Sequence, residues 1–335
     1  MDLWLQKLWY SGSPVGLLLV PLGWLFRGAV AARRWLFRRG WLASSHPGVP
    51  VVVVGNVTVG GTGKTPLVLW LVETLRRHGY QPGVISRGYG AVRLTEPRLV
   101  TADAPVEAVG DEPLLIARRT GAPVVVFPDR LAAARLLLTQ GVDVIVADDG
   151  LQHYRLARDV ELAVIDGERG LGNRRCLPAG PLREPPARLR EVDAVVVNGG
   201  KKASGRIAMA LEFGEARALH GEETRPLSSF RGQAVHALAG IGNPGRFFRQ
   251  LEAAGLNVAG HAFPDHARID AAALAFSDGA PVLMTEKDAV KCPPMSERRY
   301  WYVPVDARLG EADAAALLAL LIARLGAPGQ PAPAR

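Results

Sequence analysis

Cysteine is scarce in this chain of 335 residues. Only Cys176 and Cys292 occur, far apart and in no C-x-x-C pair. This excludes a disulfide framework and a cysteine-based zinc site, and it fits a reducing cytoplasm. The apolar share of 48% excludes a disordered chain. The length suggests about two domains, or one large domain with an appendage.

Long apolar runs are also missing. The run over residues 15–26 is interrupted by Pro21 and ends at Arg27. A transmembrane helix needs about 20 apolar residues, so this run is too short to span a bilayer. A signal peptide would carry its charges before the run and a small-residue cleavage site after it. Here most charges follow the run and no such site is present, which leaves an interfacial segment.

Acidic residues are absent between Asp2 and Glu73, and residues 1–45 carry +5 of the formal net charge of +8. Five of the seven tryptophans lie in the first 41 residues. A basic, tryptophan-rich end on a nearly balanced body favours a membrane surface over nucleic acid as the partner. We therefore expect residues 1–45 to form an amphipathic, membrane-associating helix. A compatible alternative is a helix packed on the core with solvated arginines.

From residue 50 onward, short apolar segments alternate with helical patterns. The segment 51–54 is a run of four valines, which is typical of a strand buried on both faces. The alternation predicts an α/β fold whose mostly parallel sheet has helices on both faces. Further strands are expected over 84–85, 123–127, 143–147, 161–165 and 194–197, and helices over 64–79 and 129–140.

A second, smaller α/β unit is expected to start near residue 229. Strands are predicted over 234–239, 258–262, 282–285 and 301–305, with a helix over 246–254. The predicted organisation is therefore an N-terminal helix (1–45), a core (46–228), a smaller domain (229–308), a C-terminal helix returning to the core (309–325) and a disordered Pro/Ala-rich tail (326–335).

A glycine-rich turn follows the first strand directly and precedes a helix. It reads Gly60-Gly61-Thr62-Gly63-Lys64-Thr65. Such a turn aims backbone N–H groups at an anion, and the helix N-terminus adds partial positive charge. Thr58 stands where the usual phosphate-loop pattern has its first glycine. The expected ATP-binding residues are Thr58, Val59, Gly60, Gly61, Thr62, Gly63, Lys64 and Thr65.

Two adjacent carboxylates end the strand predicted over 143–147. Asp148 and Asp149 would face the same crevice as the phosphate loop, because parallel strands present their carboxyl ends at one edge. There they could hold Mg²⁺ together with the Thr65 hydroxyl.

Three classes of protein share such a loop: GTPases, partitioning ATPases and kinases. No NKxD motif fits, since 198–201 reads Asn-Gly-Gly-Lys and 285–288 reads Thr-Glu-Lys-Asp. Partitioning ATPases carry a lysine before the glycine pair, where this chain has Val59. A kinase is therefore the favoured class. The rival is a membrane-associated ATPase that acts as a partner-binding switch.

Other motifs fit a kinase. Arg87, in Ser86-Arg87-Gly88-Tyr89-Gly90, could grip an anionic group of the substrate. Spacing alone favours Asp111 as a helix N-cap. Gln152 and His153 follow the strand-end carboxylates, and His266 lies in Phe263-Pro264-Asp265-His266.

Taken together, these segments resemble the tetraacyldisaccharide 4′-kinases, the lipid A 4′-kinases of Gram-negative bacteria. The motifs occur in order from the N-terminal helix to about residue 325, and they include Gly110-Asp111-Glu112-Pro113, Asp148-Asp149-Gly150-Leu151-Gln152-His153 and 177–184. Ala267 departs from the family, which often has a second histidine or an aromatic residue there.

The resemblance implies a P-loop NTPase-like core that transfers the γ-phosphate of ATP to the 4′-hydroxyl of a tetraacyldisaccharide 1-phosphate. It implies Asp111 as base with His266 as its partner and Lys64 at the phosphates. It also implies Thr65, Asp148, Asp149 and Glu184 at Mg²⁺, and Arg87, Gln152 and His153 at the substrate. The expected location is the cytoplasmic face of the inner membrane, with no nucleic acid and no obligate protein partner.

Overall fold

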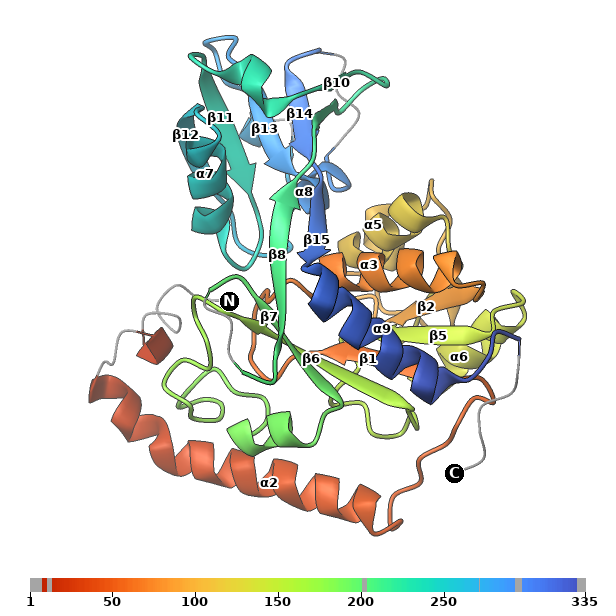
Figure 1. The fold of residues 1–335 in the computed structure, drawn as a ribbon. Helices are drawn as coiled ribbons and strands as arrows, with labels where there is room; N and C mark the ends of the chain where they lie inside the picture. The colour runs from red at the N-terminus through yellow and green to blue at the C-terminus, as the bar shows by residue number, and fades with distance from the viewer. Residues whose placement is uncertain (1–7, 11–13, 201–203, 271, 293–296, 330–335) are drawn as a thin grey trace.

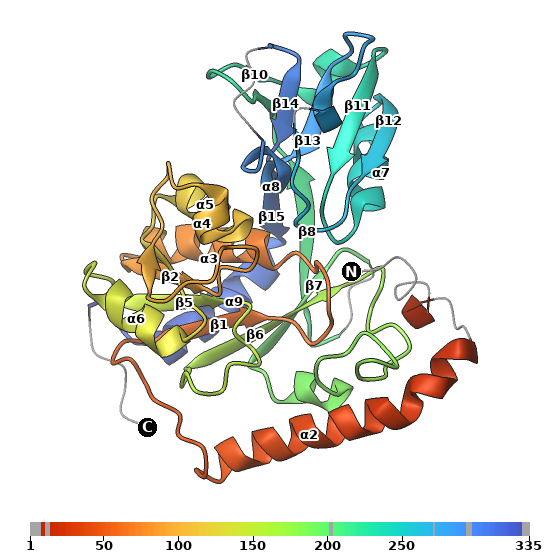
Figure 2. The same cartoon turned by 180° about the vertical axis from the view of Figure 1, so that it is seen from behind.

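Two β-sheets organise the chain. The computed structural model describes residues 8–10, 14–200, 204–270, 272–292 and 297–329. A nine-stranded sheet forms the larger unit and a six-stranded sheet the smaller one, which stands above it in Figure 1 and is seen from behind in Figure 2.

The nine-stranded sheet is mostly parallel, as predicted. Its strand order is β15-β8-β7-β6-β1-β5-β2-β4-β3, and only the edge strands β15 and β3 pair antiparallel with their neighbours. The four valines of 51–54 are fully buried because helices or loops cover both faces. The strands are β1 (Val51–Gly55), β2 (Pro82–Ser86), β3 (Arg98–Leu99), β4 (Val124–Val126), β5 (Val144–Asp148), β6 (Val160–Asp166), β7 (Ala194–Asn198), β8 (Ile207–Phe213) and β15 (Val305–Leu309).

Different elements cover the two faces of this sheet. On one face α3 (Lys64–Arg77), α5 (Asp111–Thr120) and α9 (Glu311–Leu325) bury a core that contains Leu67, Leu71 and Leu317. On the other face α6 (Arg130–Leu138) packs with Cys176, Leu182 and Phe26. Two short helices, α4 (Val106–Val109) and η2 (Pro186–Arg190), lie in connecting segments.

The six-stranded sheet has the order β10-β9-β14-β13-β11-β12. Its strands are β9 (Ala216–Ala218), β10 (Thr224–Arg225), β11 (Ala234–Ala239), β12 (Asn257–Ala262), β13 (Val282–Thr285) and β14 (Tyr300–Val303). The helical elements around it are α7 (Pro244–Ala253), α8 (Glu286–Ala289), η3 (Leu227–Phe230) and η4 (Ala272–Leu274). Phe247 and Leu251 of α7 pack with Trp301 in its core.

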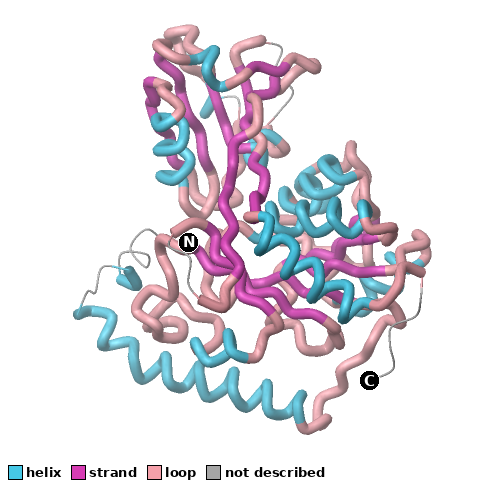
Figure 3. The backbone as a smooth tube through the Cα atoms, viewed as in Figure 1, coloured by secondary structure: helices cyan, strands magenta, loops and turns pink. Residues whose placement is uncertain are grey.

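Two neighbouring strands connect the sheets. Figure 3 shows β8 and β15 rising from the larger sheet into the smaller unit. At the crossing point the Gly214 amide donates a hydrogen bond to the Pro304 carbonyl over 2.9 Å.

The boundary expected at residue 229 does not match the strand pairing. β9 and β10 lie before that residue and already belong to the smaller sheet, while β15 belongs to the larger one. β9 is only three residues long and pairs with β14, far along the chain, so no local periodicity announces it. We propose that residues 216–303 form the smaller domain.

The N-terminal segment contains η1 (Pro14–Leu19) and α2 (Val20–Arg38). The helix over Gly16–Arg38 is long and apolar enough to cross a membrane by length and composition, although the apolar run alone was judged too short. One side of α2 packs on the body, because Gly23 is buried against Ala179. On its other sides Leu22, Trp24 and Leu25 are 51%, 69% and 72% exposed.

The tryptophans of the N-terminal segment do not all share one environment. Trp24, Trp35 and Trp41 are exposed, whereas Trp9 is buried and its indole N–H donates to the Pro178 carbonyl over 2.9 Å. The expectation of a membrane-facing residue is therefore wrong for Trp9. Trp4 lies outside the described residues.

The disordered tail was expected to start at residue 326, but residues 326–329 contact the core. Tyr80 donates to the Gly326 carbonyl, and the Gly329 amide donates to Asp143 over 3.1 Å. These contacts hold residues 326–329 against the core. Residues 330–335 lie outside the described part of the chain.

Candidate active site

The glycine-rich turn lies between β1 and α3, at the carboxyl edge of the larger sheet. Gly63 is the N-cap of α3 with φ of 90°, a left-handed conformation that favours glycine. Gly61, Thr62, Gly63, Lys64 and Thr65 line a cavity of about 180 Å³. Within the described residues, the buried Thr62 hydroxyl has no hydrogen-bond partner. The turn therefore forms part of the wall of this cavity.

The first residues of the turn face elsewhere. The Val59 amide donates to the Pro181 carbonyl over 2.8 Å, and Thr58 forms a β-bridge with Leu182. The Val59 N–H is thus not free to bind a phosphate. Of the predicted ATP-binding residues 58–65, residues 61–65 line the cavity, and ATP binding by the whole set stays a prediction.

Side chains from other elements fix the shape of the turn. Asn56 donates to the Gly60 carbonyl over 3.2 Å, and Asn198 donates to the Thr62 carbonyl over 3.1 Å. Arg169 donates to the carbonyls of Gly61 and Gly242, which belong to different units. Sequence reasoning missed Arg169 and the role of Asn198, because both act through contacts distant in the chain.

The smaller unit closes directly onto the turn at Gly242. A Cβ atom added to Gly242 would lie 2.4 Å from the Gly61 nitrogen, so only glycine permits this approach. Apolar side chains from both units line the same cavity beyond this point, among them Leu69, Leu115, Phe213, Ile241 and Phe247. The cavity thus has a polar end at the turn and an apolar wall.

Asp148 is the last residue of β5 and Asp149 follows it, and the pKa values of the two carboxyl groups are shifted in opposite directions. Burial, followed by the nearby Glu112 carboxylate, raises the pKa of Asp148 to about 7. Asp149 is also buried, but the charges of Lys64 and Arg183 prevail and hold its pKa well below the usual range. Lys64 Nζ lies 3.4 Å from Asp149, and Arg183 donates to the same carboxylate over 3.0 Å.

The surroundings of Asp148 fit a bound cation. One carboxylate oxygen accepts a 3.4 Å hydrogen bond from Ser86, and the other is buried with no partner among the described residues. Oxygen ligands of this kind suit Mg²⁺. No group of three or more His, Cys, Asp or Glu residues in the described part of the chain is arranged to hold a metal ion.

Arg130 lies behind these carboxylates and was not singled out by the sequence. It is buried and donates to the carbonyls of Asp148 over 3.0 Å and Phe127 over 3.1 Å. Burial lowers the pKa of Arg130 to about 10, against the opposing charges of Asp148 and Asp149, and nearby Arg87 lowers it further. Arg87 itself is exposed at the end of β2, beside this cluster.

Asp111 and His266 come together from different units. His266 Nδ1 lies 3.0 Å from both carboxylate oxygens of Asp111 and donates its proton to them. Asp111 is the first residue of α5, but Gly110 is the N-cap, so the expected N-cap alternative does not hold. Burial alone would raise the pKa of Asp111, but the His266 hydrogen bond and the charges of Lys287 and Lys291 lower it overall. The Tyr89 ring packs 4.7 Å from the His266 ring.

Lys287 connects this pair to the cavity. Its Nζ lies 2.9 Å from Glu112, 3.0 Å from Asp265 and 3.8 Å from Asp111. Burial alone would lower the pKa of Lys287, but these three carboxylates raise it overall, so the ammonium stays charged. Lys287, Glu112 and Asp265 line the same cavity as Lys64. The motif 285–288 was visible in the sequence, but only the fold shows that its lysine reaches α5.

Glu184 has the contacts of a structural anchor. It is fully buried and accepts hydrogen bonds from Gln152 over 2.9 Å and from Tyr154, with Arg34 and Arg188 each 3.7 Å away. The Gln152 amide also donates to the Asn56 carbonyl over 3.0 Å. Both side chains are thus occupied by protein groups, and the metal role expected for Glu184 has no support from these contacts.

His153 lies at the end of the same segment. Burial, then the nearby charge of Arg130, lowers the pKa of His153 to about 4, so its ring is neutral at pH 7. Its Nε2 atom is buried without a partner in the described structure. This leaves His153 with an unused polar atom, unlike Gln152.

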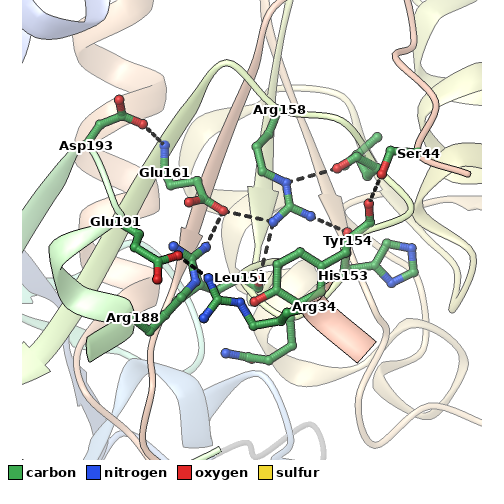
Figure 4. Close-up of polar contacts among 12 residues, drawn as sticks. Arg34, Ser44, Leu151, His153, Tyr154, Arg158, Glu161, Arg188, Glu191 and Asp193 are labelled. Atoms are coloured by element: carbon green, nitrogen blue, oxygen red, sulfur yellow. Dashed lines mark hydrogen bonds and ion pairs between the residues drawn. The ribbon is translucent and has the colours of Figure 1, made fainter. Parts of the chain in front are cut away.

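A network of charged groups holds α2 against this segment. Figure 4 shows Arg34 reaching Glu191, Arg188 reaching Glu161, and Arg158 bonded to the carbonyls of Leu151 and His153. Phe37 of α2 also packs 5.8 Å from the Tyr154 ring. The helix is therefore anchored along the body beside the segment that carries His153.

Comparison with known proteins gives the family. The model of the LpxK family, tetraacyldisaccharide-1-P 4′-kinase, matches residues 15–325. The chain belongs to this family. It is 51% identical to the tetraacyldisaccharide 4′-kinase of Nitrosococcus oceani, over 94% of this chain and 93% of that one. It is 54% identical to that of Pseudomonas fluorescens, over 89% and 90%.

A solved structure has the same fold. The crystal structure of LpxK from Aquifex aeolicus in complex with ATP superposes with a TM-score of 0.78 at 28% identity, covering 93% of this chain and 99% of that one. The predicted family and fold class are confirmed. The protein is therefore a member of a family of ATP-dependent kinases.

Proposed function

We propose that the protein transfers the γ-phosphate of ATP to the 4′-hydroxyl of tetraacyldisaccharide 1-phosphate, which gives the bis-phosphorylated lipid A precursor. The observation that carries the proposal is one cavity that joins two devices. Lys64 and Thr65 of the phosphate loop line this cavity, and so do Glu112, Asp265 and Lys287. The Lys287 Nζ atom lies 3.8 Å from Asp111, which is paired with His266.

ATP would bind with its phosphates at the turn. The backbone N–H groups at the start of α3 and the Lys64 ammonium offset phosphate charge. The apolar wall that includes Phe213, Ile241 and Phe247 would hold the adenine ring of ATP. Because this wall comes from both units, nucleotide binding would favour their closed arrangement.

Mg²⁺ would be held by Asp148 and the Thr65 hydroxyl. Asp148 has a buried oxygen without a partner in the described structure, and its pKa stays raised because burial outweighs the nearby charges of Lys64 and Arg130. When bound, the ion neutralises charge on the β- and γ-phosphate oxygens. Asp149, held by Lys64 and Arg183, would keep Lys64 in position.

Asp111 would receive the proton of the sugar hydroxyl. Its pKa lies below the ordinary value, so it is ionised at neutral pH and ready to accept a hydrogen bond. A weakly basic carboxylate suffices, because phosphoryl transfer proceeds through a loose transition state in which positioning dominates. His266 would orient Asp111 through its Nδ1–H.

The substrate groups would lie where positive charge gathers. Arg87 is exposed beside the cluster of Arg130, Asp148 and Asp149, and guanidinium groups match phosphate geometry. His153 is neutral and lies in the segment that follows Asp149, and its buried Nε2 atom has no partner in the described structure. Gln152 would contribute indirectly, by fixing the loop through Asn56 and Glu184.

The acyl chains require access to a bilayer. We propose that the protein works at the cytoplasmic face of the inner membrane, with the exposed side of α2 in the interface. Exposed leucines and tryptophans on a basic helix suit the boundary of headgroups and acyl chains. The opposite side of α2 packs on the body, which supports a helix that lies on the membrane.

A labelled-transfer assay tests the function. The protein is incubated with γ-labelled ATP, Mg²⁺, detergent and tetraacyldisaccharide 1-phosphate, and the lipid is separated from free phosphate. We expect label in the lipid, and little or none with Lys64→Ala. Slow release of free phosphate with unlabelled lipid would instead support a partner-binding ATPase.

A further inference from the structure

Two adjoining pockets lie beside α2, outside the kinase cavity. The larger, of about 340 Å³, is lined by Arg174, Arg190 and Arg206. The smaller, of about 80 Å³, is lined by Arg27, Arg174 and Arg175 together with Trp24. Arg174 and Pro186 line both pockets, so the two are neighbours, and none of these residues lines the phosphate-loop cavity.

Five arginines therefore converge from four segments: α2, the loop after β6, η2 and the residue before β8. Among the residues that the structure describes, no carboxylate lines either pocket. Within the described structure, none of the five side chains has an ion pair or hydrogen bond, in contrast to Arg34 and Arg38, which both pair with Glu191. Unpaired guanidinium groups gathered around a hollow are a site for an anion.

The surroundings indicate what kind of anion. Trp24 lines the smaller pocket and is 69% exposed, and Leu22 and Leu25 on the same helix are also exposed. A ligand that matches both the arginines and this apolar surface has an anionic group beside apolar groups, and is therefore an amphiphile. A free phosphate would use the arginines but leave the apolar surface without a partner.

We propose that the arginine pocket, defined by Arg27, Arg174, Arg175, Arg190 and Arg206, binds the phosphate of an anionic phospholipid headgroup. The proposal rests on the proposed docking of α2 at the membrane and gives it a specific contact. Bidentate guanidinium–phosphate bonds would hold the headgroup. Trp24 and the neighbouring leucines would then lie at the level of the acyl chains.

The test is a flotation assay of the full chain with phosphatidylcholine vesicles, prepared with and without phosphatidylglycerol at one ionic strength. The pocket variant is Arg174→Gln/Arg190→Gln/Arg206→Gln. The matched control, Arg98→Gln/Arg135→Gln/Arg217→Gln, removes the same charge from exposed arginines on β3, α6 and β9. We expect the pocket variant to lose about tenfold or more of the phosphatidylglycerol-dependent affinity, and the control to lose much less.

Three results would overturn the pocket. An equal loss in both variants would show non-specific charge attraction. Wild-type binding that is equal for both vesicle types would leave membrane docking by α2 in place but remove the headgroup site. Unchanged phosphatidylglycerol-dependent affinity in the pocket variant would show that these arginines do not bind the headgroup.

Transfer activity on detergent-dissolved acceptor separates this proposal from the kinase function. We expect the pocket variant to keep wild-type turnover in detergent, because its arginines lie outside the kinase cavity. Thermal melting of both variants checks that the substituted surfaces remain folded. If the wild type binds neither vesicle type, both the headgroup pocket and the membrane docking of α2 are contradicted, while the kinase proposal is unaffected.

Discussion

At the scale of single residues, the site contains three buried carboxylates, Asp111, Asp148 and Asp149, which differ in the charges around them. Asp111 and Asp149 each face cations, and their pKa values lie below the ordinary value. Asp148 faces Glu112 and has an unpartnered oxygen, and its pKa rises to about 7. Asp111 and Asp149 are therefore ionised at neutral pH, while the pKa of Asp148 lies close to neutrality.

Replacing Asp111 by Asn tests the proposed base. The amide keeps the shape but cannot accept the proton, so kcat should fall by about 100-fold or more while KM for ATP changes little. Steady-state kinetics over a range of ATP concentrations measures both values. Thermal melting controls for the lost pairing with His266. A variant with wild-type kcat would remove Asp111 from the chemistry.

Asp148 predicts a particular dependence of stability on pH. A carboxyl whose pKa rises from 3.8 to about 7 on folding holds its proton more tightly when folded. The contribution of Asp148 to the free energy of unfolding of the nucleotide-free protein should therefore fall as pH rises from about 4 to 7, because the unfolded chain releases the proton first.

Asp148→Asn removes this titration. Urea unfolding at several pH values measures the free energy of unfolding of both proteins. The value for the variant should rise relative to that of the wild type as pH rises through this window. Because other groups titrate equally in both proteins, the difference isolates Asp148. A constant difference across the window would mean that the pKa of Asp148 is not raised.

At the scale of elements, α2 combines a packed side with an exposed one. Gly23 marks the packed side, since an added Cβ would lie 3.0 Å from the Ala179 Cβ and 3.2 Å from the Cys176 carbonyl oxygen. Gly28 marks an open side, with nothing within 4 Å. The same substitution at the two positions thus separates packing from helix propensity.

Gly23→Gln should loosen α2, and Gly28→Gln should not. Overpacking at a close contact costs about 1–3 kcal/mol, whereas replacing an exposed helix glycine gains about 0.5–1 kcal/mol. Limited trypsin digestion at Arg33 and Arg34 measures how often the helix detaches. Faster cleavage is expected for Gly23→Gln alone, and equal rates in the two variants would contradict close packing of α2.

The regular elements were the part most visible in the sequence. The valines of β1, the turn that caps α3 and the alternation up to β7 were predictable, because a strand buried on both faces has a continuous apolar pattern. The short strands β9 and β10 were not, because their pairing with distant partners stabilises them.

The site was predictable in part for the same reason. Lys64, Asp148 and Asp149 follow strands of the parallel sheet, so their meeting at one edge follows from topology. The contacts of Lys287 and Arg130 depend on how distant segments pack, which no local pattern reveals. Glu184 and Val59 matched a motif, but their protein partners are visible only in the structure.

At the scale of the whole molecule, two units share one cavity and two connecting strands. Lys287 from the smaller unit bonds to Glu112 of α5, and Arg169 from the larger unit bonds to Gly242. The charge of Lys287 also lowers the pKa of Asp111. The position of the smaller unit therefore affects both the cavity and the proposed base.

Lys287→Met should move the acid limb of the kcat/KM profile to higher pH. Loss of the ammonium raises the pKa of Asp111, and activity is lost as pH falls through that pKa because the carboxylate must be ionised. Arg268→Met is the matched control, since it removes an exposed pair with Glu107 that also joins the two units. If the acid limb shifts equally in both variants, the shift comes from the loss of an ion pair between the two units and not from the charge of Lys287 on Asp111.

The central claim is that phosphate reaches one particular hydroxyl of the lipid. The most direct measurement is a phosphorus–proton correlation spectrum of the lipid formed from ATP, Mg²⁺ and tetraacyldisaccharide 1-phosphate. The account predicts a new phosphomonoester coupled to the proton at position 4′ of the distal sugar, formed by the wild type and not by Lys64→Ala. A phosphate coupled to any other position, or consumption of ATP with the lipid unchanged, would contradict it.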